Sequence, residues 1–219
     1  SPGTGGKGEG RRGGGDGEEV ASLHLPPILP DGAFRLEFQG SRPVEPMLIR
    51  EATSHRDLDE ATRIQREVWN IEDIEIVGRI QLKASQHAGG SVLVAEDEGG
   101  EIAGFAYAFP AILKGEAFWH SDMLAVRPRF RGTGVGQNLK WGQRDHALRN
   151  GVKRITWTFD PMQSGNAHLN IELLGATVAE HLENFYGVTT SALHHGLPTD
   201  RLLASWDLEA PGVVARARG

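Results

Sequence analysis

The stretch HSDMLAVRPRFRGTGVG, residues 120–136, decides the fold of this chain. Its apolar part, residues 123–126, predicts a strand that breaks at Pro128 and passes into a basic turn. The glycines of RGTGVG, residues 131–136, then open a helix. Glycine lets backbone N–H groups approach an anion without a Cβ in between, and a helix N-terminus carries about half a positive charge. The stretch therefore predicts a phosphate-binding turn between a strand and a helix.

The composition limits what the chain can bind. At 219 residues it is long enough for one domain with its own core and a tail. The net charge of −6 repels nucleic acid and anionic membranes, so we expect neither as a partner. Three arginines within residues 127–131 are a local exception, which favours a small anionic ligand bound at one place.

Several classes of protein are excluded by what the sequence lacks. There is no cysteine, which rules out disulfides, thiolate metal sites and a cysteine nucleophile. The nine histidines are scattered and no HExxH or GxSxG pattern occurs, so we expect neither a metal site nor a hydrolase. No segment approaches the roughly 18 apolar residues of a membrane span, and the first residues lack the apolar core of a secretory signal. We expect a cytoplasmic protein.

The chain divides into three parts. Residues 1–19 are rich in glycine and charge and predict a disordered tail. GTGGKGEG within them lacks the GxxxxGK[ST] spacing and follows no strand, which favours a flexible tail over a phosphate loop. Residues 20–46 form a proline-punctuated arm that either lies over the domain or pairs as a short strand near Phe34–Phe38. The compact domain is expected over residues 47–219.

The hydrophobic pattern of the domain alternates between strands and helices. Helices are expected at 55–69, 76–87, 134–150 and 166–174, and strands at 47–52, 91–96, 101–109, 120–126, 154–160, 176–182 and 201–208. Ser54 and Asp57 form a capping box for the first helix, a loop is expected over 111–116, and the chain after 208 reads as irregular. This order predicts an α+β fold in which about four helices flank a mixed sheet of about seven strands.

Two motifs carry a family resemblance. RGTGVG, residues 131–136, meets the signature of Arg or Gln, two residues, Gly, one residue, Gly or Ala, and it follows the hydrophobic-x-Val-x-Pro run LAVRP, residues 124–128. NAHLNIELLG, residues 166–175, begins Asn-Ala and ends in Gly nine residues after the Asn. Over residues 47–182 the chain resembles the GNAT superfamily of acyl-CoA-dependent N-acyltransferases. The resemblance implies a GNAT-like, mostly antiparallel central sheet and an acyl-CoA cosubstrate such as acetyl-CoA.

A closer resemblance is to one branch of the predicted GNAT proteins. HSDML, residues 120–124, and WTFDPMQSGNA, residues 157–167, match that branch's HSxML and WTFDPxxSxNA motifs. NFYG, residues 184–187, and LPTDRL, residues 197–202, resemble its C-terminal half. Some members are linked to N-succinylation of amino acids, which implies acetyl or succinyl as the acyl group and an amino acid as one candidate acceptor.

The resemblance also implies a coenzyme A site. Backbone N–H groups of residues 131–136 would hold the pyrophosphate, and the strand edge at Leu124–Val126 would diverge from its neighbour and bond the pantetheine amides. Arg129 or Arg127 either reaches the 3′-phosphate or is a solvated surface charge, and Asn166 bonds the pantetheine arm, caps its helix, or both. The expected contacts are Leu124, Ala125, Val126, Arg129, Arg131, Gly132, Thr133, Gly134, Val135, Gly136 and Asn166.

The general acid of the family does not carry over to this chain. Many members use a tyrosine five residues after the position of Asn166, where this sequence has Ile171. A thiol with a pKa near 8.5 leaves moderately well unaided, so an acid helps without being obligatory. Tyr186 is a candidate substitute, and the alternative is that it is a core or rim aromatic.

Two residues are candidates for the general base. His120, which strand alternation would place on the same side as Asp122, accepts a proton at neutral pH or acts as a structural hydrogen-bonding group. Asp160 is a base, an anchor for an amine, or a turn-capping residue before a proline. His168 and Asn170 are expected to face the acceptor pocket.

Two functions remain open from the sequence. The first is an enzyme that transfers an acyl group from acyl-CoA to a small primary amine by direct attack. The second is a non-catalytic module that binds acyl-CoA as a regulatory ligand, because the helix tyrosine and an obvious glutamate base are missing. The oligomeric state is open, with a homodimer among the possibilities.

Overall fold

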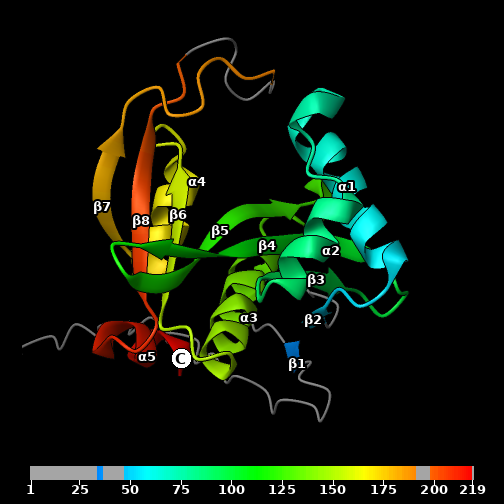
Figure 1. The fold of residues 1–219 in the computed structure, drawn as a ribbon. Helices are drawn as coiled ribbons and strands as arrows, with labels where there is room; N and C mark the ends of the chain where they lie inside the picture. Colours follow the sequence, from blue (N-terminus) through cyan, green and yellow to red (C-terminus); the bar gives the residue numbers. More distant parts are fainter. Residues whose placement is uncertain (1–33, 37–46, 191–197, 219) are drawn as a thin grey trace, which may run out of the picture.

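The computed structural model describes residues 34–36, 47–190 and 198–218. Eight described strands form one sheet in the order β1-β2-β3-β4-β5-β6-β8-β7 (Figure 1). The strands are β1 (Phe34–Leu36), β2 (Met47–Glu51), β3 (Ser91–Glu96), β4 (Ile102–Leu113), β5 (Glu116–Val126), β6 (Arg154–Phe159), β7 (Thr177–Leu182) and β8 (Arg201–Asp207). The helices are α1 (His55–Trp69), α2 (Arg79–His87), α3 (Val135–Arg149), α4 (Ser164–Ala167) and α5 (Pro211–Ala217).

The sheet confirms the expected mixed α+β fold and adds one strand. β1 pairs with β2, so the arm contributes an eighth strand at one edge. The rest of the arm, with the predicted tail at 1–19, lies outside the described residues. No helix in the described ranges is long and apolar enough to cross a membrane.

β5 and β6 form the one parallel pair among these strands, and they pair over only two residues. Trp119 lies opposite Ile155, and His120 lies opposite Thr156. Every other neighbouring pair is antiparallel. Beyond the two pairs the strands diverge, and in Figure 1 β6, β7 and β8 run in a clearly different direction from β3, β4 and β5.

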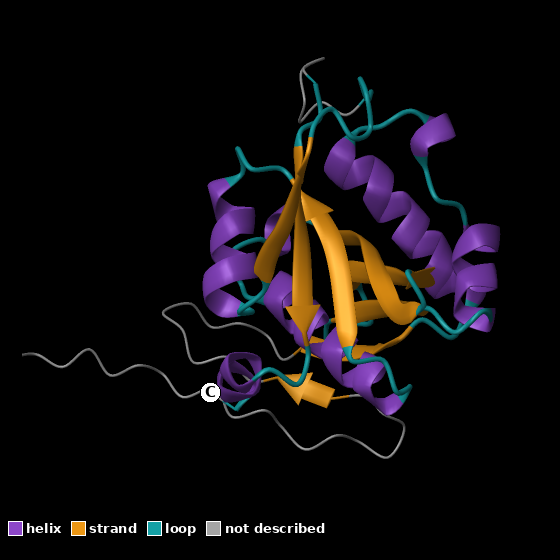
Figure 2. Ribbon diagram, turned by 60° about the vertical axis from the view of Figure 1, so that its left-hand side comes forward, coloured by secondary structure: helices purple, strands orange, loops and turns teal. Residues whose placement is uncertain are grey.

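Helices cover both faces of the sheet, as Figure 2 shows. Alternate residues of β3 point to opposite faces, so Val92 and Val94 pack with α1 and α2, whereas Leu93 and Ala95 pack with α3. A third cluster joins α3, β6, β8 and α5 through large aromatic side chains. The diverging strands are thus supported from behind by α3.

The predicted capping box at the start of α1 is confirmed. Ser54 Oγ accepts a hydrogen bond from Asp57 N at 3.1 Å, and the Asp57 carboxylate accepts from Ser54 N at 3.1 Å. The same carboxylate accepts two bonds from the Arg50 guanidinium, at 2.8 and 2.9 Å. These bonds hold the pKa of Asp57 well below its usual range. One buried carboxylate therefore ties the helix to β2.

The prediction of a loop over residues 111–116 is wrong. β4 and β5 stay paired as far as Leu113 and Glu116, and the turn between them is only Lys114 and Gly115. Both turn residues have positive φ, 52° and 82°, which matches the twist of a two-residue hairpin. Pro110 lies within β4 without breaking it, because β4 has already left β3 after Ala108 and no ladder bond is lost.

The C-terminal segment is a helix, so the prediction of an irregular end after residue 208 is wrong. Pro211 occupies the first turn of α5, where its missing N–H costs no hydrogen bond. Val213 and Ala217 are buried in the aromatic cluster. A seven-residue helix of this kind is stabilised by tertiary packing rather than by its own propensity.

Two other helices begin at positions different from those expected. The helix predicted at 76–87 starts at Arg79, after a 3₁₀ turn at Asp73–Glu75. The helix predicted at 166–174 is α4 followed by a π-helical turn at His168–Leu173. Because Gln163 holds the N-cap position of α4, the alternative that Asn166 is a helix cap is wrong.

We expect Asp57→Ala to lower the free energy of unfolding by about 3 kcal/mol at pH 7, because it removes a cap and leaves Arg50 without its main partner. The pKa of Asp57 is lowered on folding, so its contribution is complete above the unfolded value of about 4 and declines below it. Urea unfolding at pH 7 and pH 3 measures both effects.

The control for this prediction is Asp59→Ala. Asp59 pairs with Arg79 at the surface, and an exposed pair contributes less than about 1 kcal/mol. An equal loss for Asp57→Ala at both pH values would contradict the proposed linkage to the carboxylate charge.

Candidate active site

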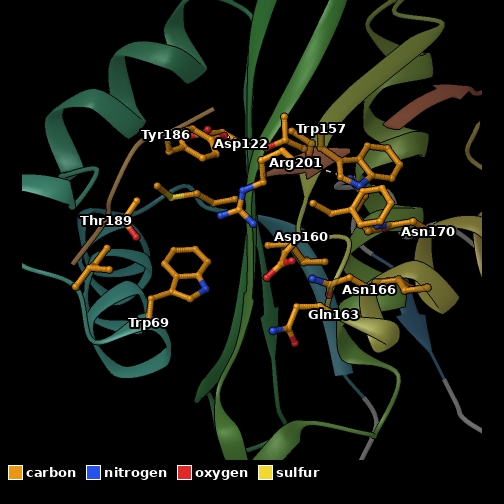
Figure 3. A pocket seen from close by; sticks show the side chains of 18 of the residues that line it. Trp69, Asp122, Trp157, Asp160, Gln163, Asn166, Asn170, Tyr186, Thr189 and Arg201 are labelled. Atoms are coloured by element: carbon orange, nitrogen blue, oxygen red, sulfur yellow. Dashed lines mark hydrogen bonds between the residues drawn. The ribbon is translucent and has the colours of Figure 1, made fainter. Parts of the chain in front are cut away.

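A cavity of about 340 Å³ opens where β5 and β6 separate. It is bordered by residues of β5, β6 and β8, by the segment after β6, and by the end of α1. In Figure 3 Arg201 reaches into the middle of the cavity, between Trp69 and Asp160. The cavity therefore brings together segments that are far apart in the sequence.

Lys140 closes the point at which the two strands part. Its Nζ lies 3.0 Å from Ser121 Oγ of β5 and 3.7 Å from the ring centre of Trp157 of β6. Ser121 and Trp157 are the first residues after the last paired positions of their strands. A third contact is made to Gln143 Oε1 at 3.1 Å, and the side chain is fully buried. Burial lowers the pKa of Lys140 to about 7.

The edge of β5 that faces β6 has no strand partner beyond His120 among the described strands. The ladder with β4 is also irregular here, because Met123 pairs with Tyr107 and Ser121 with Ala108, which leaves Asp122 as a bulge. Asp122 borders the cavity, and the surrounding protein raises the pKa of its carboxyl group by desolvation. An extended ligand can pair with this open edge.

The glycine-rich turn has the predicted strand–turn–helix form. β5 ends at Val126, a 3₁₀ turn follows, and α3 begins at Val135 with Gly134 as N-cap at φ 83°. Gly132 also has positive φ, 76°. In this conformation the first N–H groups of α3 have no acceptor within the helix and point out from its N-terminus. Thr133 Oγ1 donates to Phe130 O at 2.6 Å and braces the turn.

Two of the three arginines beside the turn, Arg127 and Arg129, are held by carboxylates. Arg127 contacts Glu60 at 2.8 Å and Glu67 at 2.9 Å, and it donates to Ile102 O at 2.6 Å, so it joins α1 to the sheet. Arg129 is half-exposed and forms an ion pair with Glu101. Arg131 Nε donates to Val126 O at 3.3 Å. Of the two arginines considered for a phosphate, Arg129 is the accessible one.

The structure does not bring His120 to the cavity. Its Nδ1 lies 2.9 Å from Thr156 Oγ1, and its ring packs against Phe109 at 5.3 Å between ring centres. Burial, and secondly the charge of Lys140, lower the pKa of His120. The bulge interrupts the strand alternation that was expected to place His120 beside Asp122. His120 thus has the contacts of a structural hydrogen-bonding group.

Other sequence-predicted residues do border the cavity. Asp160 Oδ1 accepts from Met162 N at 2.8 Å, so it caps the turn and faces the cavity as well. The hydroxyl of Tyr186 lies 3.0 Å from Thr158 Oγ1. Asn166 and the buried Asn170 also border the cavity. His168 does not.

The sequence did not indicate several lining residues, namely Trp69, Glu75, Lys140 and Arg201. Trp69 ends α1, Glu75 lies in the 3₁₀ turn before α2, and Arg201 begins β8. Trp69, Glu75 and Lys140 lie in no motif, Arg201 lies in LPTDRL without a role indicated by that motif, and the fold brings the four together. Among the described residues no group of three or more His, Asp or Glu side chains could hold a metal ion.

Residues 54–169 match the model of the acetyltransferase (GNAT) family. Because the match spans more than half of the 219 residues, the chain belongs to the GNAT acetyltransferase family. No functionally curated protein matches it.

Similar solved structures support the fold. One is yncA of Salmonella typhimurium, assigned as an acetyltransferase and solved with acetyl-CoA, with 22% identity, 75% of this chain and 95% of that chain covered, and a TM-score of 0.60. A second is the ribosomal-protein-S18-alanine N-acetyltransferase of Escherichia coli, with 20% identity, coverages of 74% and 94%, and a TM-score of 0.57. A third is a GNAT acetyltransferase of Streptococcus pneumoniae, with 19% identity, coverages of 73% and 98%, and a TM-score of 0.57.

We expect Lys140→Met to raise the pKa of His120 without restoring the ordinary value, because the charge is removed and the burial remains. Titration of the imidazole by NMR measures the shift. Lys83→Met on the exposed side of α2 is the matched control and should leave the pKa of His120 unchanged. An unchanged value in Lys140→Met would contradict the electrostatic coupling.

Proposed function

We propose that the chain is an acyl-CoA-dependent N-acyltransferase that transfers an acetyl or succinyl group to a small primary amine. The observation that carries this proposal is the joint geometry of two features. The glycine-rich turn presents the N-terminus of α3, and the open edge of β5 leads from that turn into the cavity. The turn suits a phosphate, and the cavity suits an acyl group together with its acceptor.

The residues along this path fit coenzyme A. Of the predicted residues 131–136, Arg131 already donates its N–H to Pro128 O at 3.2 Å, so the N–H groups that follow it would hold the pyrophosphate. The edge at Leu124–Val126 would pair with the pantetheine amides. Asn166 borders the same cavity, and its amide would bond the same arm. The similar yncA protein was solved with acetyl-CoA, which agrees with this assignment.

The cavity also suits an amine acceptor. Three carboxylates border it, those of Glu75, Asp122 and Asp160, and they attract an ammonium group. Arg201, whose guanidinium lies 5.3 Å from the Tyr186 ring centre, adds one cation on the same wall. Carboxylates together with an arginine suit an acceptor with both charges, so amino acids are the first acceptors to test.

Transfer requires few protein groups. The neutral amine attacks the thioester carbonyl carbon, a C–N bond forms, the C–S bond breaks, and the nitrogen loses one proton. N–H groups on the open edge of β5 would stabilise the oxyanion. Asp160 is the sequence-predicted base that borders the cavity, whereas His120 lies behind it.

Titration calorimetry with acetyl-CoA, succinyl-CoA and free coenzyme A tests binding, and a free-thiol assay with a panel of amines tests turnover. No binding of any of the three would overturn the proposal. Binding without turnover would favour the regulatory module, whereas turnover that Asp160→Ala or His120→Ala abolishes would exclude it. A cytoplasmic location and the oligomeric state stay predictions.

We expect Gly132→Ala to weaken acyl-CoA binding at least about 10-fold, because a Cβ at φ 76° forces the turn to shift. Gly151→Ala is a closely matched control. Gly151 has φ 75° beyond the other end of α3 and, like Gly132, has no neighbour near the added Cβ. Both variants should lose similar stability, and only Gly132→Ala should lose affinity by calorimetry. Equal affinities would contradict the assignment of the turn.

We expect Arg201→Met to raise the KM for amino acids about 10-fold or more while leaving that for amines without a carboxylate nearly unchanged. The reason is that, of the two kinds of acceptor, the amino acid alone has a carboxylate with which the Arg201 guanidinium can pair. Steady-state kinetics with an amino acid and its decarboxylated amine measure the difference. An equal effect on both acceptors would show that Arg201 does not select a carboxylate.

A further inference from the structure

One cation that borders the cavity, Lys140, is buried, and the binding of acyl-CoA does not by itself explain why a lysine is buried there. Lys140 is 2% exposed, and its hydrogen bonds within the described part of the chain go to neutral oxygens, those of Ser121 and Gln143. Burying an ammonium without a carboxylate partner is costly, and a hydrophobic side chain of the same length would fill the space at lower cost. The position therefore calls for a functional explanation.

Lys140 and Ser121 form a hydrogen-bonded pair that borders the cavity. An ammonium has three N–H donors, and two of them are used by Ser121 and Gln143 while the charge rests on the Trp157 ring at 3.7 Å. Ser121 Oγ accepts from Lys140 and keeps a hydroxyl hydrogen that it can donate. Both residues border the cavity at the point where β5 and β6 part.

Several other ionisable groups lie near this point. On β5, Asp122 and His120 flank Ser121, and the pKa of His120 is lowered by burial and by Lys140 itself. Asp160, Glu75 and Arg201 border the same cavity from other elements. On the π-helical turn, Ile171 occupies the position at which the family resemblance implies a tyrosine acid.

We propose that Lys140 is the proton source for the coenzyme A sulfur, and that the Ser121 hydroxyl relays the proton. This inference rests on the proposed function and assigns the general acid of the same site. As the C–S bond breaks, the sulfur takes the Ser121 hydroxyl proton, and Ser121 takes one from the Lys140 ammonium. The products are the amide, the thiol and a neutral lysine, which regains a proton from solvent.

The near-neutral pKa of Lys140 supports this geometry. Burial lowers the pKa to about 7, so the ammonium and the amine are both populated at neutral pH. A group of that pKa donates a proton to a departing thiolate and is recharged in the same pH range.

The test uses the binary complex with free coenzyme A and needs no acceptor. The thiol pKa of bound coenzyme A is read from thiolate absorbance in the wild type, Lys140→Met, Ser121→Ala, Tyr186→Phe and the control Lys83→Met. A nearby ammonium stabilises the thiolate, so we expect the thiol pKa to rise by about 1 unit or more in Lys140→Met and to be unchanged in Lys83→Met. NMR titration of Lys140 in the wild type, with coenzyme A against desulfo-coenzyme A, should give a higher lysine pKa in the presence of the sulfur.

The outcomes separate this inference from the proposed function. If coenzyme A and desulfo-coenzyme A both bind but the Lys140 pKa is the same with each, the inference fails and the proposed function stands. A thiol pKa that responds to Tyr186→Phe and not to Lys140→Met assigns the acid to Tyr186 and overturns the inference. If neither coenzyme A nor desulfo-coenzyme A binds, the inference and the proposed function both fail. With an amine that is turned over, Lys140→Met should lower kcat about 10²-fold with little change in the KM for acyl-CoA.

Discussion

The site depends on the two-residue parallel contact between β5 and β6. The connection between these strands runs through the glycine-rich turn and α3, so it is a β–α–β crossover. A crossover places the helix N-terminus at the carboxyl end of the first strand, which is where ligands bind in such units. Because the strands diverge at once after Trp119 and His120, that end also opens an unpaired edge. One short contact therefore produces both the anion-binding turn and the entrance to the cavity.

Aromatic side chains pack α3 against β6 and β8. Trp157 and Trp206 meet edge to face with ring centres 5.8 Å apart, and Trp206 also packs on Trp141 of α3 at 5.3 Å. The Trp206 indole donates to Leu174 O at 2.9 Å, which fixes the group against the π-helical turn. This wall gives the Lys140 ammonium a π surface in place of a carboxylate. An anionic group arriving in the cavity would supply the missing counter-charge.

The parts of this structure that depend on local chemistry could be predicted from the sequence. The capping box at Ser54 and the strand–turn–helix at residues 120–136 both follow from short patterns. The burial of Lys140 does not follow from any short sequence pattern. Residues 138–144 of α3 are all buried, because sheet, β8 and α5 surround the helix, and a lysine in a helix ordinarily marks a solvated face. The C-terminal helix was missed for the same reason, since its stability comes from packing against distant aromatics.

The arrangement of charge assigns the two ends of the cavity to different ligands. The carboxylates of Glu75, Asp122 and Asp160 border the cavity, whereas the helix N-terminus and Arg129 lie at the turn. The cavity also holds the cations Lys140 and Arg201, so groups of both charges can bind there, whereas an ammonium at the turn would meet a positive dipole. The turn therefore favours a phosphate over an ammonium, and this preference favours one orientation of the proposed thioester ligand. Under the proposed function, that orientation would bring the sulfur towards Ser121 and the carbonyl carbon towards the amine, which is the order that direct attack requires.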